Sequence, residues 1–274
     1  MVRDFPLSAS SLADTRPQGS SPLESAMAAL AGGTGTPQPA RLAATIMLVR
    51  DGARGVEVFM QRRAASMAFA ARRAVFPGGS LDPGDRDPVP WAGPCAQTWG
   101  QALALAPADA AAVVTAAVRE LFEEAGVLLV DRVPDPQWTA SARQRLLARD
   151  VSLGSLLREA GLVARTDLLG YHAHWITPAI EPRRYDTHFF TALLPAGQSA
   201  DAETTEAQSA HWVAPERMLT EHRDLLMPPT IVCLEDIAAA SRAADLVTIR
   251  SGVVGVQPFP LRTEGGWVLR VEVS

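Results

Sequence analysis

The segment "RELFEEAGV", Arg119 to Val127, closes an apolar, alanine-rich run that begins at Pro107. Proline suits the first turn of a helix and Gly126 is a typical stop, so the pattern predicts a helix over residues 107–125. Each residue of a helix advances by about 100°, which puts the three glutamates of the segment on one stripe and the valines and leucine on the other side. The sequence therefore predicts a helix that packs on one face and presents carboxylates on the other.

The carboxylates of this stripe belong to Glu120, Glu123 and Glu124. Like charges at this spacing repel one another by roughly 0.2–0.5 kcal/mol per pair, so a cation nearby would stabilise the helix. Mg²⁺ or Mn²⁺ prefers hard oxygen ligands and would fit such a face. Arg119 lies four residues before Glu123 and can pair with it to hold its orientation. A solvated charged face is the plainer alternative, because clustered charges on helices are common.

Upstream of this helix, "FPGGSLDPGD", Phe76 to Asp85, contains two adjacent glycines followed by carboxylates. Glycine reaches backbone angles that other residues avoid, and Pro83-Gly84 is itself typical of turns. Such a stretch forms either a tight turn or a loop that approaches a phosphate or a metal ion. The residues of the loop leave both alternatives open.

The rest of the chain mixes strand-like and helix-like patterns. The runs "LAATIMLVR" (residues 42–50) and "VEVFMQRR" (residues 56–63) are joined by the turn-rich "DGARG", which predicts a hairpin. Further strands are expected at "GYHAHWITP", "THFFTALLP" and "SAHWVAP", a helix at "PPTIVCLEDIAAASRAA" and a closing hairpin around Gly265-Gly266. This mixture predicts an α+β sandwich.

Residues 1–40 are rich in Ser, Pro, Gly, Ala and Thr and show little sustained periodicity. They predict a disordered leader in front of one domain over residues 41–274. No run of the sequence approaches the length of a membrane span, and the first residues lack the pattern of a signal peptide. A membrane partner is therefore not expected.

Net charge and cysteine content indicate which partners and cofactors are not expected. A net charge of -5 and a pI near 5.6 argue against a nucleic-acid partner, because phosphate backbones are bound through a basic excess. Cys95 and Cys233 are too few and too far apart for a disulfide framework or a zinc site, so a cytoplasmic location is expected. His172 and His174 alternate on one strand face, but without carboxylate or cysteine support they do not favour zinc. The sequence does not decide the oligomeric state, a homodimer included.

Together, "GGSLDPGD" and "RELFEEAGV" resemble the Nudix box, in which Gly, five residues, Glu and seven residues precede Arg-Glu-apolar-x-Glu-Glu-x-Gly-apolar. The second half matches at every defined position from Arg119 to Val127. Gly79 fits the first half, but Asp85 stands where the family usually has Glu, and 33 residues rather than seven separate it from Arg119. This long insertion, with "MAFA", "VFPGG" and "RRYDT" in order, resembles the peroxisomal coenzyme A diphosphatase branch of Nudix hydrolases and its bacterial relatives.

The resemblance implies an α/β/α sandwich with a mixed sheet and metal-dependent hydrolysis of a diphosphate linkage, in which water attacks phosphorus. It implies that Mg²⁺ or Mn²⁺ is bound by a carbonyl of Gly78 or Gly79 and by the carboxylates of Glu120, Glu123 and Glu124. Glu120 or Glu124 would activate the water, and Arg119 would assist them. Asp85 would be an auxiliary ligand or a structural anchor.

For the substrate, the resemblance favours coenzyme A or an acyl-coenzyme A. An upstream motif of many coenzyme A Nudix enzymes fits at Arg63 and at Phe76–Gly79, but Ala68 stands where the motif has Arg and Arg72 where it has Gly. The residues expected to contact the substrate are Arg63, Gly78, Arg183, Arg184 and Tyr185. In the structural alternative, Arg184 and Asp186 pair with each other and anchor a loop. Other substrates (NADH, ADP-ribose or a nucleotide sugar) remain alternatives, as does a Nudix-fold binding module without catalysis.

The insertion, residues 86–118, splits a motif that usually closes within one loop and one helix start. Because Asp85 and the helix must still meet near the metal, the segment is expected to leave and return at nearly the same point, as a surface excursion with a loop and a short helix. Its Trp91 and Trp99 either contact a bulky ligand or are buried against the domain.

Overall fold

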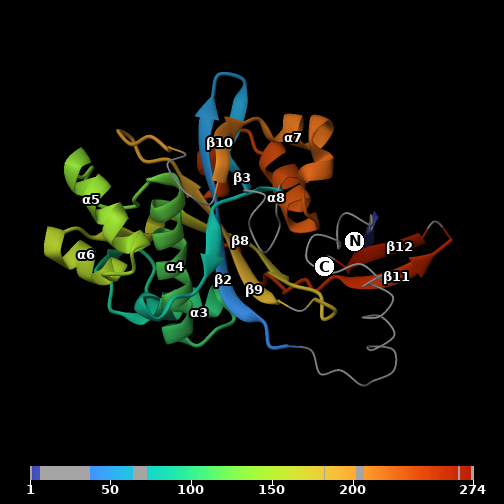
Figure 1. Cartoon of the computed structure of the whole chain (residues 1–274), viewed down its shortest axis with the longest axis horizontal. Coiled ribbons are helices and arrows are strands. Elements are labelled where there is room, and N and C mark those ends of the chain that lie inside the picture. The colour runs from blue at the N-terminus through green and yellow to red at the C-terminus, as the bar shows by residue number, and fades with distance from the viewer. Residues whose placement is uncertain are drawn as a thin grey trace. The chain divides into compact units, whose positions relative to one another are not determined.

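The computed structural model describes residues 2–6, 38–63, 73–181, 183–201, 207–264 and 266–272 (Figure 1). The chain divides into two compact units, where the sequence predicted one domain over residues 41–274. The larger unit contains Leu42–Ala173 and His188–Val253, and the smaller unit contains Met1–Arg41, His174–Thr187 and Val254–Ser274.

The elements follow one another along the chain as a mixture of short strands and helices. The strands are β1 (Val2–Pro6), β2 (Arg41–Gly52), β3 (Gly55–Arg63), β4 (Ala74–Val75), β5 (Gly78–Ser80), β6 (Trp91–Ala92), β7 (Ala164–Arg165), β8 (Leu169–Ile176), β9 (Tyr185–Leu193), β10 (Ala207–Val213), β11 (Phe259–Thr263) and β12 (Gly266–Glu272). The α-helices are α3 (Ala96–Leu103), α4 (Pro107–Ala125), α5 (Pro136–Leu147), α6 (Leu153–Ala160), α7 (Pro215–Glu221) and α8 (Pro228–Ala238). Short 3-10 turns are η1 (Pro83–Arg86), η2 (Thr166–Leu168), η3 (Arg223–Leu225) and η4 (Ala243–Leu246).

A seven-stranded sheet has the order β10-β3-β2-β9-β8, with β4 paired to β3 and β5 paired to β2. Its centre is the predicted hairpin: β2 and β3 pair antiparallel from Val49 opposite Val58 to Gly52 opposite Gly55. Consecutive residues of β2, Ile46 to Val49, are all buried, which requires cover on both faces of the strand. The hairpin expected from the two strand-like runs is therefore confirmed.

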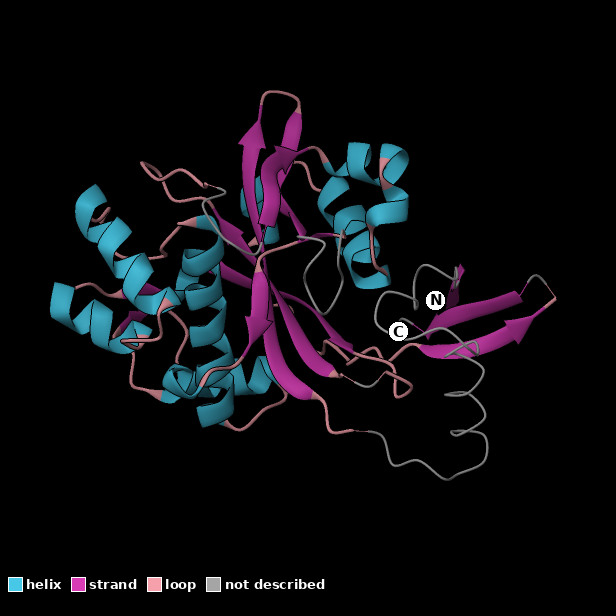
Figure 2. Ribbon diagram, viewed as in Figure 1, coloured by secondary structure: helices cyan, strands magenta, loops and turns pink. Residues whose placement is uncertain are grey.

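Helices lie on both faces of this sheet. Figure 2 shows α3, α4, α5 and α6 on one side of the strands and α7 and α8 on the other. On the first side, side chains of all four helices join those of β2 and β3 in one hydrophobic cluster. The predicted α/β/α sandwich with a mixed sheet is confirmed.

Helix α4 has the predicted bounds. It begins at Pro107 and ends at Ala125, and Gly126 follows in the left-handed conformation with φ of 69°. Most of the helix is buried, because alanines and valines of its middle turns pack into the cluster of the larger unit. A small side chain on each turn lets the helix lie close to the sheet, and Arg119 and the three glutamates lie near its C-terminal end.

The insertion is part of the core and not a surface excursion. Its short helix, α3, packs against α4, and the side chains of Trp99 and Leu103 are buried in the hydrophobic cluster. The ring of Trp99 lies edge-to-face against Phe190 of β9, with centroids 5.9 Å apart. The chain does return to its starting point as expected, but the apolar spacing of "WGQAL" makes the excursion a packed layer. Of the two alternatives for Trp99, burial is the one observed.

In the smaller unit, β1, β12 and β11 form an antiparallel three-stranded sheet. The closing hairpin is confirmed, with Thr263 opposite Gly266. Val2–Pro6 pairs with β12, and Asp4 accepts two hydrogen bonds from Arg270. The expected leader over residues 1–40 must therefore be corrected at its start, because a strand-forming stretch finds a partner at the other end of the sequence. Residues 7–37 lie outside the described part of the chain.

Within the described residues, no helix is by itself long and apolar enough to cross a membrane. The pair α3 and α4 meets that length and composition only when taken together, and it is bent by 91° at the break.

Candidate active site on helix α4

The glycine loop and the C-terminal half of α4 meet in the larger unit. β5 carries Gly78 and Gly79 and pairs antiparallel with β2, which places both glycines beside Ala44 and Thr45. The next turn, η1, contains Asp85 and packs against α4. The structure thus brings together the two halves of the split motif, which residues 86–118 separate in the sequence.

Arg119 is the centre of this meeting point. Its Nη1 donates to Oε1 of Glu120 at 2.8 Å and to Oε2 of Glu123 at 3.1 Å. Its Nη2 donates to the carbonyl oxygen of Ser80 at 3.2 Å. Burial by itself lowers the pKa of this guanidinium, but the hydrogen bond to Asp85 and the surrounding carboxylates outweigh burial and raise it. Arg119 is therefore a permanent buried cation between the helix and the glycine loop.

Asp85 is anchored rather than free to bind a metal. Oδ1 accepts from Nε of Arg119 at 2.8 Å, and Oδ2 accepts from Nη2 of the same residue at 2.9 Å. Oδ2 also accepts from the backbone N–H of Asp82 at 2.8 Å, within the turn η1. Of the two roles expected for Asp85, the geometry supports the structural anchor. The shorter carboxylate still reaches Arg119 because η1 lies directly against α4.

Glu120 is a buried carboxyl group of the cluster. Burial raises its pKa to about 7, against the lowering effect of Arg119 and with a further rise from the charge of Glu123. A Cβ atom at Gly79 would collide with the carboxylate of Glu120, so glycine lets the loop come this close without displacing that side chain. The pKa of Glu123 is also raised by burial, while Arg119 lowers it. Burial of these carboxylates in their charged form costs free energy, and a bound cation would offset that cost.

Glu124 is held by the other glycine. The backbone N–H of Gly78 donates to Oε2 of Glu124 at 3.2 Å. A Cβ at Gly78 would lie 2.5 Å from the carbonyl oxygen of Ala44, so this position also requires glycine. The glycine pair therefore serves both alternatives of the sequence: it forms a tight turn, and it approaches the carboxylates of α4.

The donor set fits a hard divalent cation. The side chains of Glu120, Glu123 and Glu124 supply oxygen atoms beside a backbone loop, which is the chemistry that Mg²⁺ and Mn²⁺ prefer. The oxygens of these three glutamates do not all lie within 4.8 Å of one another, and Nη1 of Arg119 donates to both Glu120 and Glu123. The predicted ligand role of the Gly79 carbonyl remains a prediction.

Of the predicted substrate-binding residues, Gly78 lies in the glycine loop beside Glu124. Arg63 ends β3, and its side chain is not described. Arg183, Arg184 and Tyr185 belong to the smaller unit, where Arg183 is exposed. Arg184 donates to the carbonyls of Thr177 and Gln38 at 3.1 and 2.8 Å. Its Nη2 donates to Oε1 of Gln257 at 3.2 Å, so this guanidinium has the structural role that the sequence left as the alternative.

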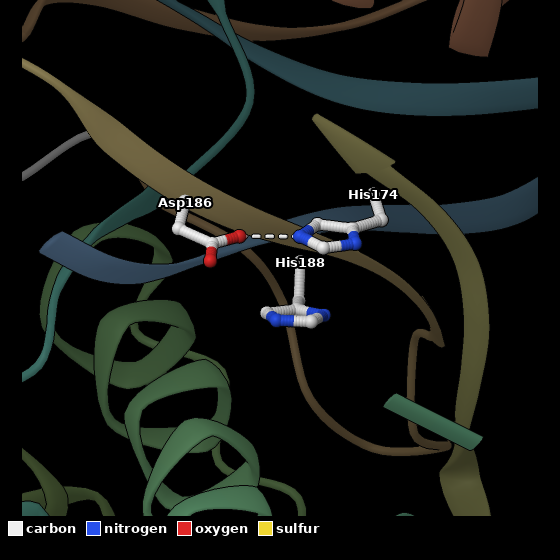
Figure 3. A group of neighbouring side chains, drawn as sticks. All are labelled: His174, Asp186 and His188. Atoms are coloured by element: carbon white, nitrogen blue, oxygen red, sulfur yellow. Dashed lines mark hydrogen bonds and ion pairs between the residues drawn. The ribbon is translucent and has the colours of Figure 1, made fainter. Parts of the chain in front are cut away.

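The partner of Asp186 is a histidine and not Arg184. Figure 3 shows Asp186 of β9 joined to Nε2 of His174 of β8, within the smaller unit. His188, also drawn, follows two residues later on β9, and its Nδ1 shares a hydrogen bond of 3.0 Å with the hydroxyl of Tyr171 in the larger unit. The expectation that Arg184 pairs with Asp186 is wrong, because each of the two binds other groups.

Sequence reasoning missed three residues that contact the end of α4: Gln61 of β3, Arg143 of α5 and Asp201. Gln61 interrupts a buried strand and is itself buried, which is a weak sign of a specific partner. Arg143 looks like its exposed neighbour Arg145 in "TASARQRLL", so no local pattern distinguishes it. A cavity of about 380 Å³ lies beside Arg143 and Asp201, and none of the predicted carboxylates lines it.

Comparisons with known proteins agree with this geometry. The family model described as the NUDT19 Nudix domain matches residues 86–234, which include α4 but begin just after Asp85. The Caenorhabditis elegans protein "Putative nudix hydrolase 7" is 30% identical over 186 residues, which cover 66% of this chain and 54% of the relative. This chain thus spans about half the length of that relative. The crystal structure of a NUDIX hydrolase from Alicyclobacillus acidocaldarius superposes with a TM-score of 0.59 and 27% identity, over 77% of this chain and 98% of the other.

Proposed function

Because the chain belongs to the Nudix hydrolase family, we propose that it hydrolyses a diphosphate linkage in a nucleoside diphosphate derivative, most readily coenzyme A or an acyl-coenzyme A. The observation that carries this proposal is the meeting of Gly78 and Gly79 with the glutamates of α4 around the buried Arg119. A packed fold alone has no need for three glutamates at one helix end, since each buried charge costs free energy.

In the proposed reaction, Glu120, Glu123 and Glu124 hold Mg²⁺ or Mn²⁺. When bound, the metal would polarise the phosphoryl oxygens, lower the pKa of the attacking water and offset the charge that develops in the transition state. Glu120 or Glu124 takes the proton of that water. Arg119 keeps Glu120 and Glu123 oriented through Nη1, and Asp85 fixes Arg119 through both of its oxygens. The chain thereby presents preformed carboxylates to the metal.

The preference for coenzyme A rests on resemblance. The long insertion and the "RRYDT" stretch are similar to the peroxisomal coenzyme A diphosphatase branch, and the family model that matches is of the same type. Hydrolysis of the coenzyme A diphosphate by water would give 4′-phosphopantetheine and adenosine 3′,5′-bisphosphate. NADH, ADP-ribose and nucleotide sugars contain the same linkage and are the substrates to compare.

A binding module without catalysis is the competing function. The substitution of Asp85 for Glu and the long insertion would favour it, but the structure gives Asp85 the anchoring contact to Arg119 and packs the insertion into the core. Neither feature removes a carboxylate from the site. Intact glutamates on α4 therefore favour the enzyme.

The test is a substrate panel. Coenzyme A, acetyl-coenzyme A, NADH, ADP-ribose and UDP-glucose are each incubated with the protein in Mg²⁺, in Mn²⁺ and in EDTA, and the products are separated by chromatography. We expect metal-dependent cleavage, with the highest kcat/KM for coenzyme A or its ester. Cleavage of NADH or ADP-ribose alone would show that the substrate is one of these nucleotides and not coenzyme A. Tight binding of a nucleotide without cleavage under any metal would establish the binding module instead.

A further inference from the structure

Helix α4 ends with carbonyl groups that an isolated helix leaves without partners. In a helix that stops at Ala125, the last four carbonyl oxygens, those of residues 122–125, have no N–H further along the helix to accept from. The backbone N–H of Gly126 donates to the carbonyl of Phe122 at 3.0 Å, as the left-handed residue after a helix commonly does. The other three carbonyls lie on the turn that carries Glu123 and Glu124.

Three groups from three distant parts of the chain bind these remaining carbonyls. Nε of Arg143, on α5, donates to the carbonyl of Glu123 at 3.0 Å. Nε2 of Gln61, on β3, donates to the carbonyl of Glu124 at 3.1 Å. The backbone N–H of Asp201 donates to the carbonyl of Ala125 at 3.1 Å. We call Gln61, Arg143 and Asp201 the terminal clamp.

Two members of the clamp bind each other, and two of its side chains are buried. Nη1 of Arg143 donates to Oδ1 of Asp201 at 2.6 Å, so the helix α5 and the loop before residue 202 hold each other as well as α4. The side chains of Gln61 and Arg143 are both less than a tenth exposed. A Cβ at Gly126 would lie 2.7 Å from Oδ2 of Asp201 and 3.0 Å from Nη1 of Arg143. Glycine at this position therefore ends the helix and leaves room for the clamp.

Glu123 and Glu124 are consequently held at two ends each. The carboxylate of Glu123 accepts from Arg119, and its carbonyl accepts from Arg143. The carboxylate of Glu124 accepts from the N–H of Gly78, and its carbonyl accepts from Gln61. A carboxylate with a flexible backbone would have to be ordered when metal and substrate bind, whereas this turn is already fixed.

From these contacts we propose that Gln61 and Arg143 are positioning residues, which hold the last turn of α4 so that the carboxylates of Glu123 and Glu124 stay in place for the metal. The inference rests on the proposed function of the site. Neither residue touches substrate or metal, because each acts through the carbonyl of a glutamate. Partners of this kind typically contribute about 10- to 100-fold to metal affinity or activity.

The experiment compares Arg143→Met and Gln61→Met with Leu146→Ala. Methionine keeps an unbranched side chain but removes the donor. Leu146 is buried on the same helix as Arg143, and its truncation weakens packing without touching a carbonyl of α4. Mn²⁺ affinity is measured by the electron paramagnetic resonance signal of free Mn²⁺, alongside melting temperature, kcat and KM.

We expect Arg143→Met and Gln61→Met each to raise the Kd for Mn²⁺ about tenfold and to lower kcat by a similar factor, with KM changed less than about threefold. Leu146→Ala should lower the melting temperature at least as much and leave the Kd for Mn²⁺ at the wild-type value. Should Arg143→Met fail to fold, Arg143→Lys is tested instead, because lysine keeps the charge and one donor group. We expect its Kd for Mn²⁺ to lie between the wild-type value and the tenfold higher value expected without a donor.

Wild-type Mn²⁺ affinity in both donor-free variants would overturn the inference, and so would an equal loss of affinity in Leu146→Ala. These outcomes leave the proposed function standing, because the wild-type protein remains active in the same assay. A wild-type protein that neither binds Mn²⁺ nor cleaves a diphosphate would instead overturn the proposed function, and the positioning role with it.

Discussion

Arg119 and Arg184 are both arginines whose nitrogen atoms are fully engaged, yet their surroundings differ. Arg119 binds the carboxylates of Asp85, Glu120 and Glu123 in a buried site of the larger unit. Arg184 binds two backbone carbonyls and an amide oxygen in the smaller unit. The first arrangement concentrates charge where burial makes it costly, and the second satisfies neutral acceptors near solvent.

This difference separates a site from a scaffold. Neutral acceptors bound by one arginine fix the path of a loop and need nothing more. Burying a cation among three carboxylates costs free energy on folding, and burial raises the pKa of Glu120 and of Glu123. Such costs are kept where chemistry uses them. Both arginines stand in stretches that resemble family motifs, and only the contacts distinguish their roles.

The largest expected difference is in stability. Arg119→Gln leaves Asp85 and the neighbouring carboxylates buried without their cation, which should cost about 3–5 kcal/mol in the metal-free protein. Arg184→Gln loses hydrogen bonds to neutral groups and should cost about 1 kcal/mol. Thermal denaturation of both variants in EDTA measures the contrast. Equal losses would mean that charge burial does not set the two regions apart.

The next effect is on turnover. Glu123→Gln and Glu124→Gln each remove a charge from the proposed metal site and should lower kcat by at least about a hundredfold, with the fold intact. Glu159→Gln is the matched control, because Glu159 is exposed on α6 and pairs only with Arg145 among the described contacts. Arg184→Gln should leave KM within about threefold of wild type. A large rise in KM there would restore the substrate contact predicted from the sequence.

A smaller effect concerns pH. The folded pKa of Glu120, about 7, exceeds its ordinary value of 4.5 because of burial, so folding favours the protonated form. The free energy of unfolding of the metal-free protein should therefore fall as pH rises from 4.5 to 7 and change little from this group above 7. Glu120→Gln abolishes that fall. The free energy of unfolding of the variant minus that of wild type should therefore increase from pH 5 to pH 8, by on the order of 1–2 kcal/mol. A difference that is the same at both pH values would show that Glu120 is not protonated by burial.

Local patterns were enough to predict α4, the β2–β3 hairpin and the closing hairpin. In each of these elements, the period of the apolar residues and the turn glycines favour the same helix or hairpin that tertiary packing favours, so the local sequence is enough to predict it. The helices α5 and α6 were not predicted, although Asp135 before Pro136 and Ser152 ahead of Gly161 are typical helix boundaries. Val2–Pro6 could not be assigned, because its partner β12 lies at the opposite end of the sequence.

Of the candidate site, the resemblance supplied the glutamates, the glycines and Arg119. It could not choose a role for Asp85, because the distance across the insertion is settled only by packing of η1 against α4. It also could not identify Gln61 or Arg143, because these side chains donate hydrogen bonds to backbone carbonyls of α4, which is distant from both in the sequence. Trp99 looked equally suited to a ligand and to the core until α3 was seen to pack on α4.

We propose that the glutamates of α4 bind the divalent metal. Anomalous diffraction from crystals soaked in Mn²⁺ tests it directly, because the anomalous peak marks the metal itself. We predict a peak within coordinating distance of carboxylate oxygens of Glu120, Glu123 and Glu124, beside the carbonyl of Gly79. A Mn²⁺ peak elsewhere, with none at these glutamates, in crystals of a protein that requires Mn²⁺ for hydrolysis would contradict the account.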